Sequence, residues 1–109
     1  MWLGVDYYPE QWDPSLLEED LDTIRELGCN VIRIAEFGWH LMEPEEGRYD
    51  FSFFDHVIGR AKERGLSIIM GTPTAAIPAW LAKRWPDILS MEANGQRRAY
   101  GGRHTACYH

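Results

Sequence analysis

Residues 30–35 read NVIRIA, a compact run rich in β-branched residues that predicts a buried strand. Helical patterns precede and follow it, over residues 13–28 and 52–65. Two further apolar runs predict one strand before the first helix, residues 1–6, and one after the second helix, residues 66–70. Residues 66–70 should be buried like residues 30–35. The resulting order, β-α-β-α-β in units of about thirty residues, is typical of a parallel sheet that is covered by helices.

Both predicted helices carry signals at their ends. Asp13 and Ser52 are favoured N-cap residues, and Gly28 and Gly65 are natural C-terminal stops. The apolar stripes follow helical spacing, with Leu17, Leu21 and Ile24 in the first helix and Phe54, Val57, Ile58 and Ala61 in the second.

The rest of the chain is predicted to be mostly loop. Residues 36–47 are rich in Trp, Pro and Glu, and residues 77–85 should form one or two helical turns that end at Pro86. Asn94-Gly95 is a two-residue turn signal inside a basic stretch, residues 96–103.

Composition narrows the possible functions. A chain of 109 residues fits one domain, and its net charge of −6 argues against a general nucleic-acid binder and against docking on an anionic membrane. We find no secretory signal and no apolar run near the roughly 18 residues that a membrane span needs. Cys29 and Cys107 are far apart and do not make a disulfide scaffold, so we expect a reducing cytoplasm.

Two architectures use alternating strands and helices of this kind: the doubly wound open sheet and the (β/α)8 barrel. The first predicted strand is followed by YYPEQW, residues 7–12, where a nucleotide-binding fold would have a glycine-rich turn. The absence of a glycine-rich turn weakens the nucleotide-binding interpretation.

Polar and aromatic side chains gather directly after each predicted strand. In both architectures these positions share one face, where sites are built. Aromatic rings beside carboxylates suit a sugar, although the same rings can simply fill the top of a barrel. The residues are Asp6, Tyr7, Tyr8, Glu10 and Trp12 after the first strand, Glu36, Phe37, Trp39, His40 and Glu43 after the second, and Thr72, Thr74 and Trp80 after the third.

Arg33 lies inside an apolar strand, so its guanidinium needs a carboxylate partner. It either orients an active-site carboxylate or pairs with an acidic residue on a neighbouring strand. The four histidines show no metal-ligand spacing, and His104 with Cys107 forms only an H-x-x-C pair, where a zinc site needs four ligands.

Five segments in order resemble the N-terminal part of the family 42 glycoside hydrolases, the β-galactosidases. The resemblance implies an incomplete (β/α)8 barrel over residues 1–109, consisting of the first three βα units, and retaining hydrolysis of terminal β-D-galactose from β-galactosides. The segments are GVDYYPEQW (4–12), VIRIAEFGW (31–39), EPEEGRYDF (43–51), GTPTAAIPAWL (71–81) and GGR (101–103).

The resemblance also implies roles for particular residues. Arg103 matches a substrate-binding arginine of the family. Arg33 and Glu36, from their positions within and directly after the second predicted strand, are further candidates to bind the substrate. Cys107 matches the first ligand of a structural zinc found in many members, although His104-Thr105-Ala106 departs from the usual pattern. No cofactor is required, and the parent enzyme is expected to be a homo-oligomer, a trimer in many members.

The acid/base of the family is the Glu of an Asn-Glu pair after a later strand, and this sequence contains no such pair. We therefore expect both catalytic carboxylates to be absent and the 109 residues alone to be inactive and marginally stable. Two alternatives remain open: a small doubly wound α/β binding module, and a non-functional gene remnant.

Overall fold

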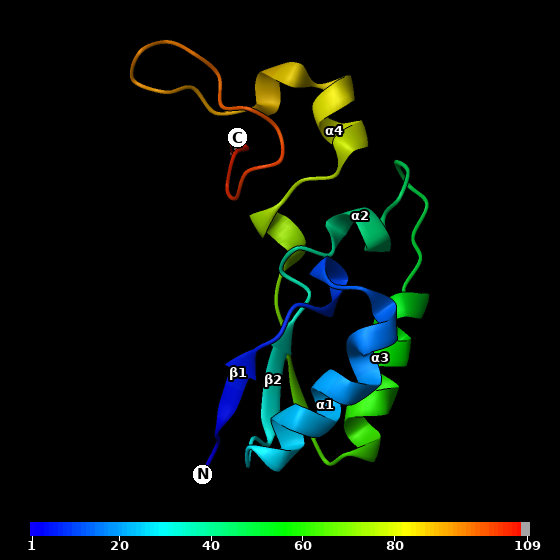
Figure 1. Ribbon diagram of the computed structural model, residues 1–109. Coiled ribbons are helices and arrows are strands. Elements are labelled where there is room, and N and C mark those ends of the chain that lie inside the picture. Colours follow the sequence, from blue (N-terminus) through cyan, green and yellow to red (C-terminus); the bar gives the residue numbers. More distant parts are fainter. Residues whose placement is uncertain (108–109) are drawn as a thin grey trace.

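The computed structural model describes residues 1–107, which form a parallel sheet with helices on one face (Figure 1). The strands are β1 (Gly4–Asp6), β2 (Val31–Ile34) and β3 (Ser67–Met70). The α-helices are α1 (Leu17–Glu26), α2 (Trp39–Met42), α3 (Ser52–Glu63) and α4 (Ala79–Arg84), and short 3-10 turns are η1 (Pro9–Gln11), η2 (Pro14–Leu16), η3 (Pro73–Ala75) and η4 (Pro86–Ile88). The predicted β-α-β-α-β order is confirmed.

β2 lies in the middle of the sheet, in the order β1-β2-β3, and Val31 faces Gly4 on one side and Ser67 on the other. Because alternate side chains of a strand point to opposite faces, Ile32 and Ile34 both face the helices and are fully buried. The predicted stripes of α1 and α3 cover them; Leu21, Phe54, Val57 and Ala61 are each at most 1% exposed.

The other face of the sheet is open. Arg33 and Ile69, which pair in register, are both exposed on this face. The prediction that 66–70 is buried is correct for Leu66, which is 5% exposed, but wrong for Ile69 and Met70, which are 53% and 47% exposed. Within residues 1–107 no strand lies along the outer edge of β1 or of β3. The apolar strand β3 is therefore only partly covered, and residues outside 1–107 would be needed to bury the rest of it.

Three local predictions need correction. β1 begins at Gly4 rather than Met1, and one helical turn, α2, interrupts the predicted 36–47 loop. Ser52 is the first residue of α3 rather than its cap, because Asp50 Oδ1 already accepts hydrogen bonds from the Ser52 N–H (2.9 Å) and Oγ (2.6 Å). The Asp13 cap is confirmed: its Oδ1 accepts from the Ser15 N–H at 2.9 Å, although the first turn that follows is 3-10.

The segment after β3 stands over the carboxyl ends of the strands (Figure 1). Its hairpin turns one residue earlier than predicted: the Gly95 N–H donates to the Glu92 carbonyl (2.9 Å) and Gly95 has φ +82. This arrangement is typical of a three-residue hairpin loop, in which glycine takes the left-handed position after the turn. No helix among the described residues is long and apolar enough to cross a membrane.

Candidate active site

Glu36 is the centre of a charged cluster just past the carboxyl end of β2, and only 6% of its surface is exposed. Its Oε2 accepts a hydrogen bond from the Tyr8 hydroxyl at 3.1 Å and lies 3.5 Å from Arg103 Nη2. Its Oε1 forms an ion pair with Arg33 Nη2. The structure thus brings together the three candidate substrate-binding residues, and Arg103 reaches Arg33 and Glu36 from 67 positions beyond Glu36 in the sequence.

The partner of Arg33 is Glu36, three residues along the chain. The alternative of a partner on a neighbouring strand is not what the described residues show, because a turn after β2 brings the carboxylate back over the end of its own strand. Arg33 thus holds a carboxylate of the candidate site.

The cluster carries more positive than negative charge. Two guanidinium groups share one carboxylate, and the side chains of Arg33 and Arg103 remain 49% and 58% exposed. A guanidinium has five N–H donors, so each keeps donors that are free to bind the oxygens of a ligand. Desolvation and the hydrogen bond to Glu36 raise the pKa of the Tyr8 hydroxyl, which therefore stays a neutral donor.

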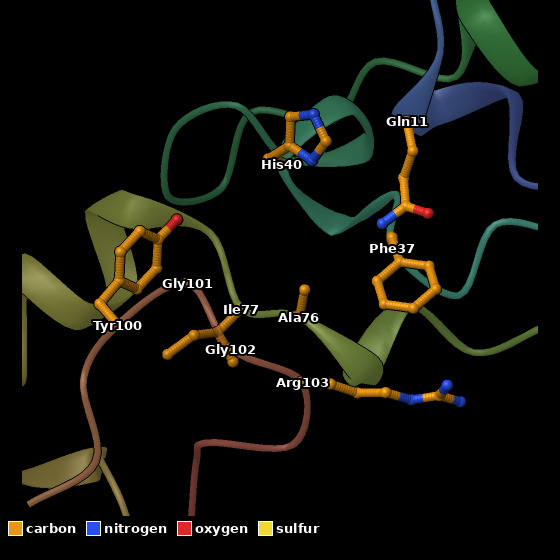
Figure 2. A pocket seen from close by; sticks show the side chains of 9 residues that line it. All are labelled: Gln11, Phe37, His40, Ala76, Ile77, Tyr100, Gly101, Gly102 and Arg103. Carbon is orange, nitrogen blue, oxygen red and sulfur yellow. The ribbon is translucent and has the colours of Figure 1, made fainter.

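A pocket of about 240 Å³ opens beside this cluster (Figure 2). The Arg103 guanidinium lies 5.4 Å from the centre of the Phe37 ring, and Tyr8 meets the same ring edge-on at 4.9 Å. A ring and a cation side by side suit a ligand with an apolar C–H face and hydroxyl edges. The lining residues are Gln11, Phe37, His40, Ala76, Ile77, Tyr100, Gly101, Gly102 and Arg103.

Glu43 and its neighbours serve the structure rather than the pocket. Its side-chain oxygens accept from Trp39 Nε1 and the Gly47 N–H, both at 2.9 Å, and these hydrogen bonds hold its pKa below the usual value. Trp80 Nε1 donates to its carbonyl oxygen at 2.8 Å. For Trp39 and Trp80, the interpretation that aromatic residues fill the barrel top is the better one.

Tyr7 also leaves the predicted cluster. It is 8% exposed, and its hydroxyl donates to Asp20 of α1 at 2.9 Å. Of the two adjacent tyrosines, only Tyr8 faces the charged cluster. The sequence did not distinguish them, although successive residues after a strand are expected to point to opposite sides.

Gly71 is a contributor that sequence reasoning missed. A Cβ atom at this position would lie 2.5 Å from Glu36 Cγ, so only glycine lets the carboxylate side chain pack over the end of β3. Its signal in the sequence is a glycine that directly follows the predicted strand 66–70.

Cys107, the candidate zinc ligand, faces an apolar pocket. That pocket is lined by Trp39, Thr74, Ile77, Leu81, Ile88 and Ala106 together with the cysteine itself. Among residues 1–107 no group of three or more His, Cys, Asp or Glu side chains could hold a metal. The other ligands of a four-ligand zinc site would have to come from outside the described residues, so the zinc ligand stays a prediction.

Comparisons with known proteins identify the family of this chain. A family model described as β-galactosidase, glycoside hydrolase family 42, matches residues 6–109. Two β-galactosidases, from Clostridium cellulovorans and Thermus thermophilus, are each 44% identical to this chain. The matches extend over 108 and 106 residues and cover 99% and 97% of this chain. The crystal structure of β-galactosidase from Bacillus circulans sp. alkalophilus superposes with a TM-score of 0.87 at 38% identity, over 98% of this chain.

The fold and the site define the class: the chain forms the first βα units of a (β/α)8 barrel with its site at the carboxyl ends of the strands. The chain belongs to glycoside hydrolase family 42, the β-galactosidases, and corresponds to their N-terminal part. It spans 16% of the length of the Clostridium and Thermus relatives, and also 16% of the Bacillus circulans chain.

Proposed function

We propose that these residues form one wall of the galactose pocket of a retaining β-galactosidase, which releases terminal β-D-galactose from β-galactosides. The observation that carries this proposal is the convergence of Arg33, Glu36 and Arg103 beside the Phe37 ring, in a chain of this family. In this proposal Arg103 donates hydrogen bonds to sugar hydroxyls, and Phe37 covers an apolar face of the ring.

The bond-breaking carboxyl pair is not expected among residues 1–107. Retaining chemistry needs one carboxyl as acid/base and a second, about 5–5.5 Å away, as nucleophile. Glu36 is unsuited to either task, because two guanidinium groups and a phenol occupy its oxygens. We infer that both catalytic carboxylates come from residues that this chain does not contain, and that the 109 residues alone are inactive.

Further features of the whole enzyme are proposals on the same basis. Cys29 and Cys107 are free thiols in the structure, which is consistent with a reducing cytoplasm that receives imported β-galactosides. The net charge of −6 supports a small-molecule substrate rather than nucleic acid or an anionic membrane. A trimeric assembly remains a prediction from the family. The relatives described above are β-galactosidases, so nothing favours a doubly wound binding module.

A hybrid enzyme tests the proposal. Residues 1–109 of this chain would replace the matching segment of the Thermus thermophilus β-galactosidase, to which they are 44% identical. We expect the hybrid enzyme to hydrolyse nitrophenyl β-D-galactoside in preference to the β-glucoside and β-mannoside. A folded hybrid enzyme without galactosidase activity, or one that prefers another sugar, would contradict the proposal.

Arg103→Ala in the hybrid enzyme tests the role of the pocket. Loss of charged hydrogen bonds of about 1.5–3 kcal/mol should lower kcat/KM for the galactoside by roughly 10- to 100-fold. Arg48→Ala is the matched control, because this arginine is also exposed and, within residues 1–107, its ion-pair partner is Glu45, at 3.5 Å, rather than a residue of the pocket. Equal activities of the two variants would show that Arg103 does not bind the sugar.

A further inference from the structure

The turn after β2 has an unusual backbone. Ala35 has φ +82, a left-handed conformation that residues with a Cβ atom rarely adopt, and its side chain is fully buried. The Gly38 N–H donates to the Ala35 carbonyl at 2.9 Å and closes the turn. A non-glycine residue in this conformation persists only where its surroundings hold it.

Glu10, from the 3-10 turn after β1, supplies such a hold. Its Oε1 accepts a hydrogen bond from the Phe37 N–H at 3.3 Å, across 27 positions of sequence. Its Oε2 is buried and has no hydrogen-bond partner among the described residues. Burial raises the pKa of Glu10, whereas hydrogen bonds from the backbone, including those of Phe37 and Ala35, lower it.

The residue between these two backbone positions is Glu36. Its carboxylate meets Tyr8, Arg33 and Arg103, and its carbonyl oxygen accepts from the Ala75 N–H at 3.2 Å. Phe37 carries the ring that lies against Arg103 and lines the pocket (Figure 2). A shift of the Ala35 turn would therefore move the carboxylate and the ring together.

We propose that Glu10 is a positioning residue: as a hydrogen-bond acceptor it holds the left-handed Ala35 turn, which places Glu36 and Phe37 against Arg103. The inference rests on the proposed galactoside site and adds to it a residue that does not touch the sugar. Only an acceptor oxygen is needed for this role, and no proton is transferred.

Four variants of the hybrid enzyme separate positioning from direct catalysis. Glu10→Ala removes the acceptor and should lower kcat/KM for nitrophenyl β-D-galactoside by about 10- to 100-fold, as expected for a displacement of order 1 Å. Glu10→Gln keeps an acceptor oxygen and should stay within about threefold of the unmodified hybrid enzyme. Glu19→Ala, an exposed carboxylate of α1, is the matched control and should change neither activity nor Tm appreciably.

The double variant Glu10→Ala with Ala35→Gly is the decisive one. Glycine adopts positive φ without a side-chain penalty, so the turn at position 35 should persist without the hydrogen bond to Glu10. The double variant should therefore recover at least half of the lost kcat/KM on a logarithmic scale. If Glu10→Gln is as impaired as Glu10→Ala, or if Ala35→Gly restores nothing, the positioning role is wrong.

Thermal unfolding gives a second readout that does not need activity. Glu10→Ala should lower Tm, and adding Ala35→Gly should restore part of the loss. An inactive but folded hybrid enzyme would contradict the proposed function. The Tm values of the variants would still test whether Glu10 holds the Ala35 turn. Unchanged Tm and activity in Glu10→Ala would overturn this positioning role.

Discussion

Glu36 takes part in three side-chain contacts, with Tyr8, Arg33 and Arg103. Its side chain occupies space that is available only because residue 71 is glycine. The types of these residues were predictable from the sequence, since carboxylates, cations and rings follow the strands. Their connections were not, because they depend on a left-handed alanine and on the missing side chain of Gly71. Alternation alone could have separated Tyr8 from Tyr7, but the sequence does not give the phase of alternation beyond a strand end.

Gly71→Ala in the hybrid enzyme should disturb Glu36 directly. The new Cβ would lie 2.5 Å from Glu36 Cγ, which is closer than real Cβ contacts come. Overpacking of this kind costs about 1–3 kcal/mol, so Tm and kcat/KM for the galactoside should both fall.

Gly59→Ala is the matched control, because a Cβ there meets nothing within 4 Å and the residue lies inside α3. Alanine in a helix interior is favoured over glycine by about 0.5–1 kcal/mol, so this variant should unfold at a slightly higher temperature. A Gly71→Ala enzyme as stable and as active as the Gly59→Ala enzyme would contradict the close packing of Glu36.

Tyr8→Phe should remove one donor from Glu36 without changing the shape of the ring. The lost hydrogen bond to a charged group is worth about 1.5–3 kcal/mol, so the hybrid enzyme should lose stability while the edge contact with Phe37 stays. The thermal unfolding of the two proteins checks this. An unchanged Tm would mean that the hydroxyl does not serve Glu36.

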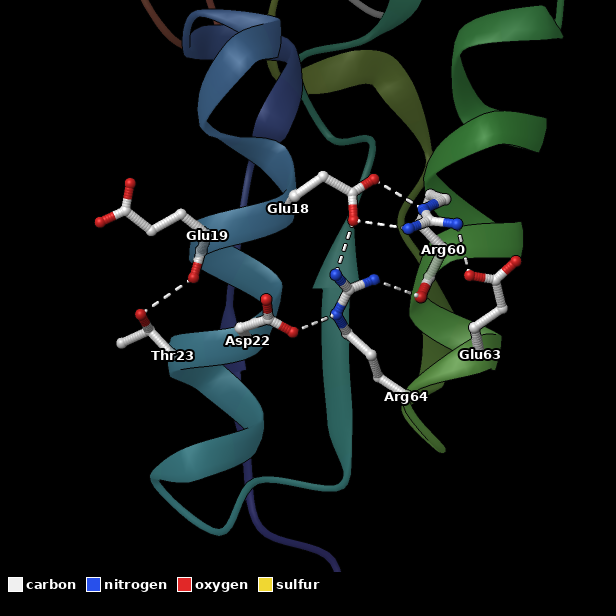
Figure 3. Close-up of polar contacts among 7 residues, drawn as sticks. All are labelled: Glu18, Glu19, Asp22, Thr23, Arg60, Glu63 and Arg64. Carbon is white, nitrogen blue, oxygen red and sulfur yellow. Dashed lines mark hydrogen bonds and ion pairs between the residues drawn. The ribbon is translucent and has the colours of Figure 1, made fainter.

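Among the elements, α1 and α3 are joined by ion pairs as well as by their apolar stripes (Figure 3). Glu18 lies 2.6 Å from nitrogens of both Arg60 and Arg64, and Asp22 lies 2.6 Å from Arg64. Hydrogen bonds from the two arginines lower the pKa of Glu18 to about 2. The stripes were predictable from helical spacing, but the ion pairs required the crossing of the two helices.

The network should make stability depend on pH. The pKa of Glu18 is lower in the fold than in the unfolded chain, so its contribution is present above the ordinary glutamate pKa of about 4.3. It is lost as the pH falls from there toward 2. The Tm difference between the hybrid enzyme and its Glu18→Gln variant should therefore shrink between pH 6 and pH 2.

Added salt should reduce the same difference, because these side chains are partly exposed and their charges are screened. Glu19→Gln is the control, since the Glu19 carboxylate points away from α3 (Figure 3). If Glu18→Gln and Glu19→Gln shift Tm equally at every pH, the ion pairs contribute nothing specific.

Element ends were the least predictable part of the fold. Asp50 rather than Ser52 fixes the start of α3, and the hairpin turns around Ala93-Asn94 with Gly95 after them. In both cases the sequence offers two start points for the element that lie only one or two positions apart. Which of them takes the terminal position depends on the contacts of the flanking backbone.

Considered as a whole, the described residues form one sector of a barrel. Their radius of gyration is 16.2 Å, against about 13 Å for a compact domain of this length. The open sheet face exposes Ile69, and Met70 at the end of β3 is exposed on the opposite face. One edge each of β1 and β3 has no strand partner within residues 1–107. The packing of the helix face was predictable from periodicity. The exposure of β3 was not, because its apolar sequence is the same whether the residues that cover it belong to this chain or lie outside it.

The isolated 109-residue chain should therefore lack a cooperative thermal transition and should bind a dye that reports exposed apolar surface. The hybrid enzyme provides the comparison, because there the same residues meet the rest of a barrel. A sharp, two-state transition of the isolated chain with no dye binding would show that the sector is a domain in its own right.

Turnover of a chromogenic β-galactoside by the purified 109-residue chain, measured beside the hybrid enzyme, most directly tests the claim that this chain supplies sugar-binding residues but not the catalytic pair. We predict hydrolysis by the hybrid enzyme and none by the isolated chain. Turnover by the isolated chain that is abolished by Glu36→Gln or Glu10→Gln would contradict the claim, because a carboxyl group assigned here to binding or positioning would then be catalytic.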